Sequence, residues 1–178
     1  LLIEPRRLAA KAAATRLAQS IGEPVGKRVG YSVRNEQKRS DATSIEAITD
    51  GLFLRRLQSQ PDLPGVAIVI FDEFHERRRD SDVALALLRE ARQLLRPDLK
   101  LLLMSATLQL ESLSAQFEGA DTLTSQGRAF PVETRHSPAR HQERLETHVL
   151  RVIEEEVREL EDNRHAGEAP PGVLVFLP

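Results

Sequence analysis

Two adjacent carboxylates directly follow the most apolar run of the sequence. Residues 66–71 read VAIVIF, a pattern typical of a buried strand, and Asp72 and Glu73 come immediately after it. Such a strand would present both side chains rigidly at the edge of a sheet. Asp72 would hold Mg²⁺ largely through water, because Mg²⁺ keeps several waters and takes few protein carboxylates. Glu73 would orient and deprotonate a water that attacks a phosphate.

Two other interpretations of these acids involve different chemistry or none. In the structural one, Asp72 caps a helix and Glu73 lies in its first turn, where the helix dipole favours negative charge. In the other, His75 and Glu76 begin the zinc-protease pattern H-E-x-x-H, which needs a histidine at position 79. The sequence has Arg79 there, so zinc hydrolysis is excluded. A magnesium site and a helix start both remain open on these residues alone.

The elements around the acid pair predict a parallel α/β sheet, because strands alternate with helices at the expected spacing. Residues 66–71 and 99–104 predict strands buried on both faces. Asp72 and Ser105 each follow one of these strands, and a single helix connects the two. We therefore expect both residues at the carboxyl edge of the sheet, where ligands bind in such folds.

Apolar periodicity and turn residues predict the other elements as well. Residues 34–43 are polar and predict an exposed loop. The remaining elements up to residue 123 are strands at 1–4, 27–33, 44–48 and 121–123, and helices at 6–20, 52–59, 82–95 and 109–117. The apolar face of the third helix is expected to comprise Val83, Leu87, Leu88, Ala91, Leu94 and Leu95.

The last third of the chain predicts a linker and a second structural unit. Residues 125–131 read SQGRAFP and predict the linker. Beyond it we expect a new sheet beginning at 132–136, a long amphipathic helix at 141–163 and a third buried strand at 173–177.

Length and composition limit the class of protein. The 178 residues suffice for one domain and part of another, and the first and last residues fall in or next to predicted strands, so we expect a fragment of a longer protein. No run of 18 apolar residues predicts a membrane span. Cysteine is absent, which excludes disulfides and thiolate metal sites and favours a reducing, cytoplasmic location. The net charge of −2 does not by itself indicate a nucleic-acid partner.

The run DEFHER at residues 72–77 resembles motif II of the DEAH-box helicases, most closely the HrpB type, in which Phe replaces Ala. Its acids then correspond to a Walker B site. Other short segments match motifs of the same family in the correct order. They are PRRLAA at 5–10 (motif Ia), GYSVR at 30–34, TDG at 49–51 (motif Ib), SAT at 105–107 (motif III), GRAFPV at 127–132 and VLVFLP at 173–178 (motif IV).

The resemblance implies an α/β fold of the RecA-like P-loop NTPase type. Residues 1–126 would form a first RecA-like domain truncated at its N-terminus, residues 127–131 a linker, and residues 132–178 the start of a second domain. The phosphate-binding pattern G-x-x-x-x-G-K-[ST] does not occur in the sequence. Family order places it upstream of Leu1, so we expect the isolated chain to be inactive.

The resemblance also implies roles for individual residues of the ATP site. Asp72 and Glu73 would coordinate Mg²⁺, partly through water, and Glu73 would be the general base. Within the box formed by Asp72, Glu73, Phe74 and His75, the histidine would couple hydrolysis to domain movement, as would Ser105 and Thr107. The hydroxyls of Ser105 and Thr107 would also suit a turn or a helix cap.

A second group of residues lies at two predicted helix starts, which favour phosphate groups. The nucleic-acid-binding residues implied by the family are Pro5, Arg6, Arg7, Thr49, Asp50 and Gly51. The alternative without function for Arg6 and Arg7 is that they lie on a solvated helix face. Arg77, Arg78 and Arg79 are better explained as a solvated or ion-paired run than as an RNA site.

The function implied is that of an ATP-dependent RNA helicase, which couples hydrolysis of ATP with Mg²⁺ to movement on, or unwinding of, RNA. The partner would be single-stranded RNA bound through its sugar–phosphate backbone, with little base specificity. Two alternatives stay open at this point. One is a non-catalytic nucleic-acid-binding scaffold on a degenerate helicase fold, and the other is a helicase that acts on DNA.

Overall fold

The computed structural model describes residues 1–106, 117, 119–125, 132–162 and 172–176. The chain divides into two compact units, Leu1–Thr124 and Ser125–Pro178, which we call the first and second unit. Among the described residues, no helix combines the length and the hydropathy needed to cross a membrane.

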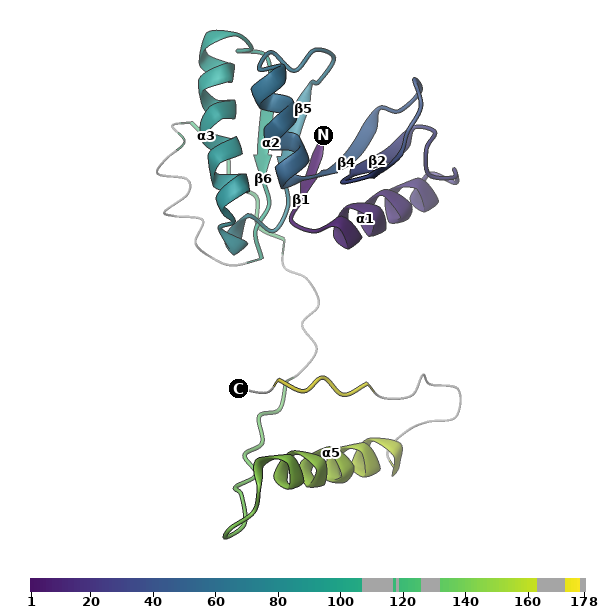
Figure 1. Ribbon diagram of the computed structural model, residues 1–178, viewed down its shortest axis with the longest axis vertical. Coiled ribbons are helices and arrows are strands. Elements are labelled where there is room, and N and C mark those ends of the chain that lie inside the picture. Colours follow the sequence, from purple (N-terminus) through teal and green to yellow (C-terminus); the bar gives the residue numbers. More distant parts are fainter. Residues whose placement is uncertain (107–116, 118, 126–131, 163–171, 177–178) are drawn as a thin grey trace. The chain divides into compact units, whose positions relative to one another are not determined.

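A six-stranded sheet forms the centre of the first unit, with strand order β3-β2-β4-β1-β5-β6 (Figure 1). All neighbouring strands pair in parallel except β3, which runs antiparallel to β2. The strands are β1 (Leu2–Glu4), β2 (Val29–Val33), β3 (Glu36–Lys38), β4 (Ile45–Thr49), β5 (Ile68–Phe71) and β6 (Lys100–Leu103). The predicted α/β class with a largely parallel sheet is confirmed.

Helices cover both faces of this sheet. Helix α1 (Arg7–Ser20) buries a stripe of small residues, Ala10, Ala14 and Ala18, which lets it lie close to β2 and β4. Helices α2 (Asp50–Ser59) and α3 (Arg79–Leu94) pack side by side on the opposite face (Figure 1).

Strand register explains which residues reach each layer. Ile3 aligns with Ile48 and Phe71, and all three belong to the core beneath α2 and α3. The preceding residue, Leu2, aligns with Ala47, and both contribute to the core beneath α1. Successive strand residues therefore feed two separate cores, as the alternation of side chains along a strand requires.

Residues 34–42 are exposed as predicted, but the prediction that the whole segment 34–43 is a loop is wrong, because it contains β3. Arg34 and Asn35 form a two-residue turn between β2 and β3, and Asn35 adopts a left-handed conformation (φ 65°), in which asparagine is enriched. All three residues of β3 are polar and exposed, so the strand has no apolar alternation that would have predicted it.

The prediction that the strands near 66–71 and 99–104 are buried on both faces is also wrong. One face packs against α2 and α3, but on the other Ile68 is 37% and Leu102 42% exposed. The reason is the position of α1, which packs on the β2–β4 side of the sheet, while β6 lies at its edge.

Helix α3 begins three residues earlier than predicted, and it buries only part of the predicted apolar face. Its buried residues are Ala84, Leu85, Leu88 and Ala91. The prediction is confirmed for Leu88 and Ala91, and Leu87 packs against the core. It is wrong for Val83, Leu94 and Leu95, which are exposed. The helix predicted at 109–117 lies outside the described residues except for Phe117, which packs against the core.

The second unit contains helix α5 (Leu145–Asp162), which begins after a turn at 141–142 and none of whose residues is buried. Strands were predicted at 121–123, 132–136 and 173–177, but the described residues of these segments form none. Val173 to Phe176 are exposed, so the prediction of a buried strand there is wrong. A strand needs a hydrogen-bonded neighbour, and the described part of this unit offers no partner strand.

Candidate active site and nucleic-acid edge

Four neighbouring strands bring the candidate residues to one edge of the sheet. Strands β4, β1, β5 and β6 are adjacent and parallel, so their carboxyl ends meet there. Glu4 aligns with Thr49, and Phe71 aligns with both Ile3 and Leu103. The segments that follow these strands begin with Pro5, Asp50, Asp72 and Met104.

The turn after β5 is anchored to both neighbouring strands. Asp72 donates its backbone N–H to Ile3 O (2.9 Å), and Phe74 donates its own to Met104 O (2.9 Å). The Phe74 ring is buried and meets Phe71 edge-on, with centroids 6.0 Å apart. Phe74 is thus the apolar anchor of a short 3₁₀ turn, Phe74–Glu76. We call Asp72–Glu76 the acid turn.

The two acids occupy different environments within the acid turn. Asp72 is half-buried, and its Oδ1 accepts the N–H of Glu73 (2.8 Å). Glu73 is exposed and adopts a left-handed backbone conformation (φ 49°) at the start of the 3₁₀ turn. Neither side chain caps an α-helix, since α3 begins only at Arg79 and no side-chain cap is present at the 3₁₀ turn. The structure therefore does not support the helix-cap interpretation of Asp72.

A third carboxyl group, that of Glu4, joins this site and was missed by the sequence analysis. Glu4 ends β1 and is only 3% exposed, and its side chain is hydrogen-bonded to that of Asp72. Burial, followed by the charges of Asp72 and Glu73, raises the pKa of Glu4 to about 7. The signal in the sequence was an acid as the last residue of a predicted buried strand.

His75 connects the acid turn to the segment after β6. Its Nδ1 accepts the backbone N–H of Ala106 at 3.3 Å and lies 3.2 Å from Glu73 Oε2. Ser105, the preceding residue, is half-buried beside this contact. Thr107 lies outside the described residues. The structure thus brings His75 together with Glu73 and with the backbone of the predicted motif III.

The six candidate nucleic-acid residues differ in exposure. Pro5, Thr49 and Asp50 are buried, whereas Arg6 and Arg7 are exposed at the start of α1. Gly51 is half-buried, and a Cβ there would lie 3.2 Å from Asp80 Oδ2. The pairing of Glu4 with Thr49 places the two helix starts next to each other.

The charge of Asp50 is already met within the protein. Its Oδ2 accepts from Arg78 Nε at 2.7 Å, so the carboxylate faces a guanidinium rather than solvent. Arg77 pairs with Asp82 and Arg79 with Asp80, which makes the whole arginine run ion-paired.

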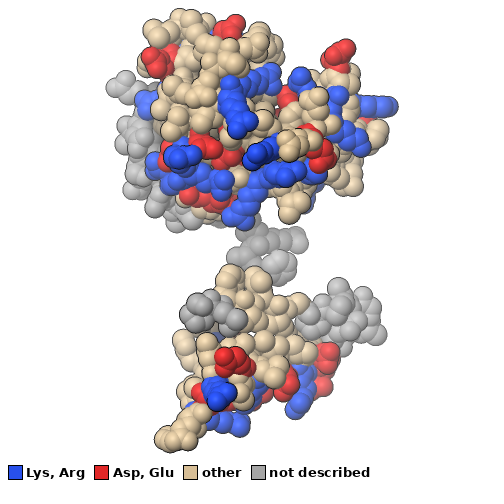
Figure 2. All heavy atoms as spheres, viewed as in Figure 1, with Lys and Arg blue, Asp and Glu red and all other residues tan. Residues whose placement is uncertain are grey.

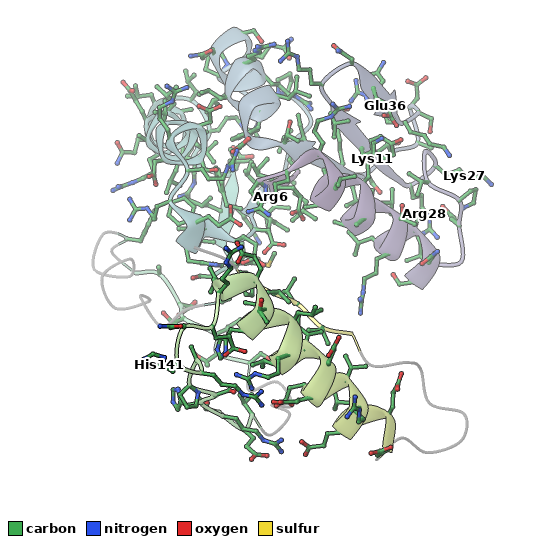
Figure 3. The ribbon with its side chains drawn as sticks, turned by 60° about the horizontal axis from the view of Figure 1, so that its bottom comes forward. Arg6, Lys11, Lys27, Arg28, Glu36 and His141 are labelled. Atoms are coloured by element: carbon green, nitrogen blue, oxygen red, sulfur yellow. The ribbon has the colours of Figure 1, made fainter. Side chains whose placement is uncertain are left out.

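On the face of the first unit that is visible in Figure 2, the described basic side chains do not form a patch of one sign. Figure 2 shows Lys and Arg interspersed with Asp and Glu on the visible face of this unit. Along α1, Lys11 pairs with Glu36, and Arg28 pairs with Glu23 nearby (Figure 3). Any phosphate contact at this edge therefore depends on a few placed residues such as Arg6 and Arg7, not on a broad positive field.

The donor set at the acid turn fits a magnesium ion that is bound mainly through water and phosphate. Asp72 and Glu73 offer carboxylate oxygens, which Mg²⁺ prefers. The raised pKa of Glu4 reflects first its burial and then the negative charge of Asp72 and Glu73, and a cation would offset this charge. Among the described residues, no group of three or more His, Cys, Asp or Glu side chains is arranged to hold a metal alone. ATP phosphates would need further donors, because the phosphate-loop pattern is absent from the sequence.

A mostly parallel sheet with helices on both faces and an acid turn at its carboxyl edge defines a RecA-like helicase fold. One relative is HrpB: the chain is 44% identical over all 178 residues to the ATP-dependent RNA helicase HrpB of Escherichia coli (strain K12) and spans 21% of its length. The predicted resemblance to HrpB-type DEAH-box helicases is confirmed.

Solved structures agree with this relationship. A crystal structure of Escherichia coli DEAH/RHA helicase HrpB matches 89% of this chain and 20% of its own, with a TM-score of 0.82 and 44% identity. A second one, described as the DExH-box NTPase HrpB, matches the same shares with a TM-score of 0.76. No protein-family model matches the chain.

Proposed function

We propose that this chain is the central part of an ATP-dependent RNA helicase and carries its water-activating acid turn. The observation that carries the proposal is the acid turn itself, held by backbone hydrogen bonds to Ile3 and Met104 at the edge of the sheet. The name of the Escherichia coli relative supports it. Asp72 would hold Mg²⁺ through water, and Glu73 would accept the proton of the attacking water. The bound ion would neutralise charge on the phosphates.

We further propose that His75, Ser105 and Thr107 couple the ATP site to the rest of the motor. The contact of His75 Nδ1 with Ala106 N–H supports this role, because it joins the acid turn to the segment after β6, so a shift of one segment would displace the other. The domain limits remain those proposed from the sequence, namely 1–126, 127–131 and 132–178.

The nucleic-acid edge would consist of Pro5, Arg6, Arg7, Thr49, Asp50 and Gly51. The exposed guanidinium groups of Arg6 and Arg7 would bind phosphate. The buried Thr49 and Asp50 would shape the backbone at the start of α2, and the buried Pro5 would do so before α1. Phosphate contacts carry no sequence information, so RNA binding should depend little on base identity.

The substitution Glu73→Gln in the full-length protein tests the catalytic role. It keeps the size of the side chain but removes the base, so ATP binding should persist while RNA-stimulated turnover falls by about 10²–10⁴-fold. Glu90→Gln, on the exposed side of α3, is the matched control and should turn over ATP like the wild type. Unchanged turnover in the Glu73 variant would remove this residue from the role of base.

The alternatives are separated by nucleic-acid assays on the same wild-type protein. RNA binding without any ATP turnover would favour the non-catalytic scaffold. Turnover stimulated by single-stranded DNA but not by RNA of equal length would favour a DNA helicase.

A further inference from the structure

Asp50, the first residue of α2, is a buried carboxylate whose charged partner comes from another part of the first unit. Its side chain is 7% exposed. Oδ1 accepts the N–H of Gly51 at 2.8 Å, and Oδ2 accepts from Arg78 Nε at 2.7 Å and from Ser81 Oγ at 3.5 Å. A buried carboxylate without a charged partner is strongly unfavourable. Arg78 therefore supplies the positive charge that this position requires.

Arg78 lies close to the acid turn in the sequence, and only Arg77 separates the two. Arg77 closes the 3₁₀ turn in a left-handed conformation (φ 47°), Arg78 is extended, and α3 begins at the next residue. Only two residues separate Arg78 from His75. The position of the Arg78 guanidinium therefore depends on the position of the acid turn.

Glu76 extends these charged contacts to the start of α1. Its Oε1 lies 3.2 Å from the Arg6 guanidinium, and its Oε2 lies 4.0 Å from that of Arg78. Arg6 stands at the end of α1 nearest the sheet edge (Figure 3). Charges of alternating sign thus connect the start of α1, the acid turn and the start of α2. We call Arg6, Glu76, Arg78 and Asp50 the charged chain.

The charged chain links strand ends that do not touch directly. Strands β4 and β5 are separated by β1, so no ladder of backbone hydrogen bonds joins Thr49 to Asp72. Helices α2 and α3 do pack together, but through apolar residues such as Phe53 and Leu88 in the core. The charged chain is a separate polar connection at the edge where the chemistry is proposed.

From these contacts we propose, resting on the proposed function, that Arg78 is a positioning residue that couples the acid turn to the nucleic-acid edge at Thr49–Gly51. A displacement of the acid turn moves Arg78, and with it the carboxylate of Asp50 and the first turn of α2. The coupling is reciprocal, so RNA held at that edge favours the turnover-competent position of Glu73. Arg78 is not among the residues proposed to bind the metal, the water or the phosphates, and its guanidinium already pairs with Asp50 and Glu76.

The test compares Arg78→Gln with Arg79→Gln in the full-length protein. Arg79 is the matched control, because its side chain is 90% exposed and pairs with the adjacent Asp80. ATP turnover is measured with and without single-stranded oligouridylate. For Arg78→Gln we expect basal turnover within about twofold of wild type and a loss of RNA stimulation of about 5–10-fold, the low end of typical coupling between sites. Arg79→Gln should behave like wild type.

Arg78→Lys keeps the charge but loses the second guanidinium contact, so it should retain part of the stimulation. It also serves if the Gln variant does not fold, which a thermal melt would show. A double variant, Asp50→Asn with Arg78→Gln, should lose no more stimulation than Asp50→Asn alone, because Arg78 acts through Asp50.

Three results would overturn the proposal: full stimulation in Arg78→Gln, equal loss of basal and stimulated turnover, or multiplicative losses in the double variant. A wild-type protein that RNA does not stimulate would instead overturn the proposed function. The two failures are therefore distinguishable in one set of assays.

Discussion

Glu4 shows how the acid turn affects the ionisation of its neighbours. Its carboxyl group is buried at the end of β1, beside Asp72 and within the field of Glu73. Two nearby negative charges and the loss of water both favour the protonated form. The side chain can then donate a hydrogen bond to Asp72, which an ionised Glu4 could not do.

Glu4 therefore makes stability depend on pH in a defined direction. Its pKa is about 7 in the folded chain against 4.5 in the unfolded one, so the folded state binds the proton more tightly. The contribution to the free energy of unfolding is complete below pH 4.5 and is lost as the pH rises through 7. Its size would be about 1–3 kcal/mol.

Thermal unfolding at pH 5 and at pH 8, without added Mg²⁺, measures this effect. Wild type should lose more stability between the two pH values than Glu4→Gln, which has no proton to release. Glu90→Gln should follow wild type, because its side chain lies outside the site. If the Glu4 variant shows the same pH dependence as wild type, the group does not titrate in this range.

At the scale of single elements, the β2–β3 hairpin depends on a glycine. A Cβ at Gly30 would lie 2.7 Å from Lys38 O and 2.9 Å from Arg39 Cβ, both closer than real contacts allow. Gly30→Ala should therefore push the end of β3 away from β2 and lower the free energy of unfolding by about 1–3 kcal/mol. Urea unfolding of the variant checks this value.

Gly172→Ala is the control for that experiment, since an added Cβ there meets no atom within 4 Å. It should shift the urea midpoint far less than Gly30→Ala. Equal midpoints for the two variants would mean that the hairpin adjusts without cost.

Elements with strong apolar periodicity were predicted correctly from the sequence. The predictions failed where neighbouring strands or helices determine the structure. The β-branched run before Asp72 correctly predicted the strand that ends at Phe71, and with it the place of the acid pair at the edge of the sheet. Strand β3 is wholly polar, and only Asn35 in its turn could have indicated it. The exposure of Leu102 depends on which part of the sheet α1 covers, and periodicity carries no such information.

The candidate site divides in the same way. Neighbouring parallel strands placed His75 beside the segment after β6, as topology alone had predicted. The pairing of Asp50 with Arg78 could not be predicted, because it joins side chains 28 residues apart across two helix starts. Glu4 was missed for a related reason, since its role depends on Asp72, which follows β5 and is distant in the sequence, although β1 and β5 are neighbours in the sheet.

At the scale of the whole chain, the sequence contains the acid pair of the proposed ATP site but not its phosphate-binding loop. In the proposed function the acid turn would supply carboxylates for a metal and a water, yet the 178 residues contain no G-x-x-x-x-G-K-[ST] pattern. Backbone N–H groups and the lysine of such a loop hold the nucleotide phosphates. Without them, a water activated by Glu73 would have no fixed phosphorus atom to attack.

We therefore predict that the purified 178-residue polypeptide hydrolyses ATP at less than about 1% of the rate of the full-length protein, since positioning supplies most of the catalysis of phosphoryl transfer. Phosphate release is measured for both proteins with Mg²⁺ and RNA present. Circular dichroism establishes that the polypeptide contains folded helix, so that a low rate reflects missing phosphate contacts. Robust release by the polypeptide that Glu73→Gln abolishes would show that the described edge holds ATP by itself. In that case Arg6 and Arg7 would be the first residues to test as its phosphate ligands, because they are the exposed cations at the start of α1 next to the acid turn.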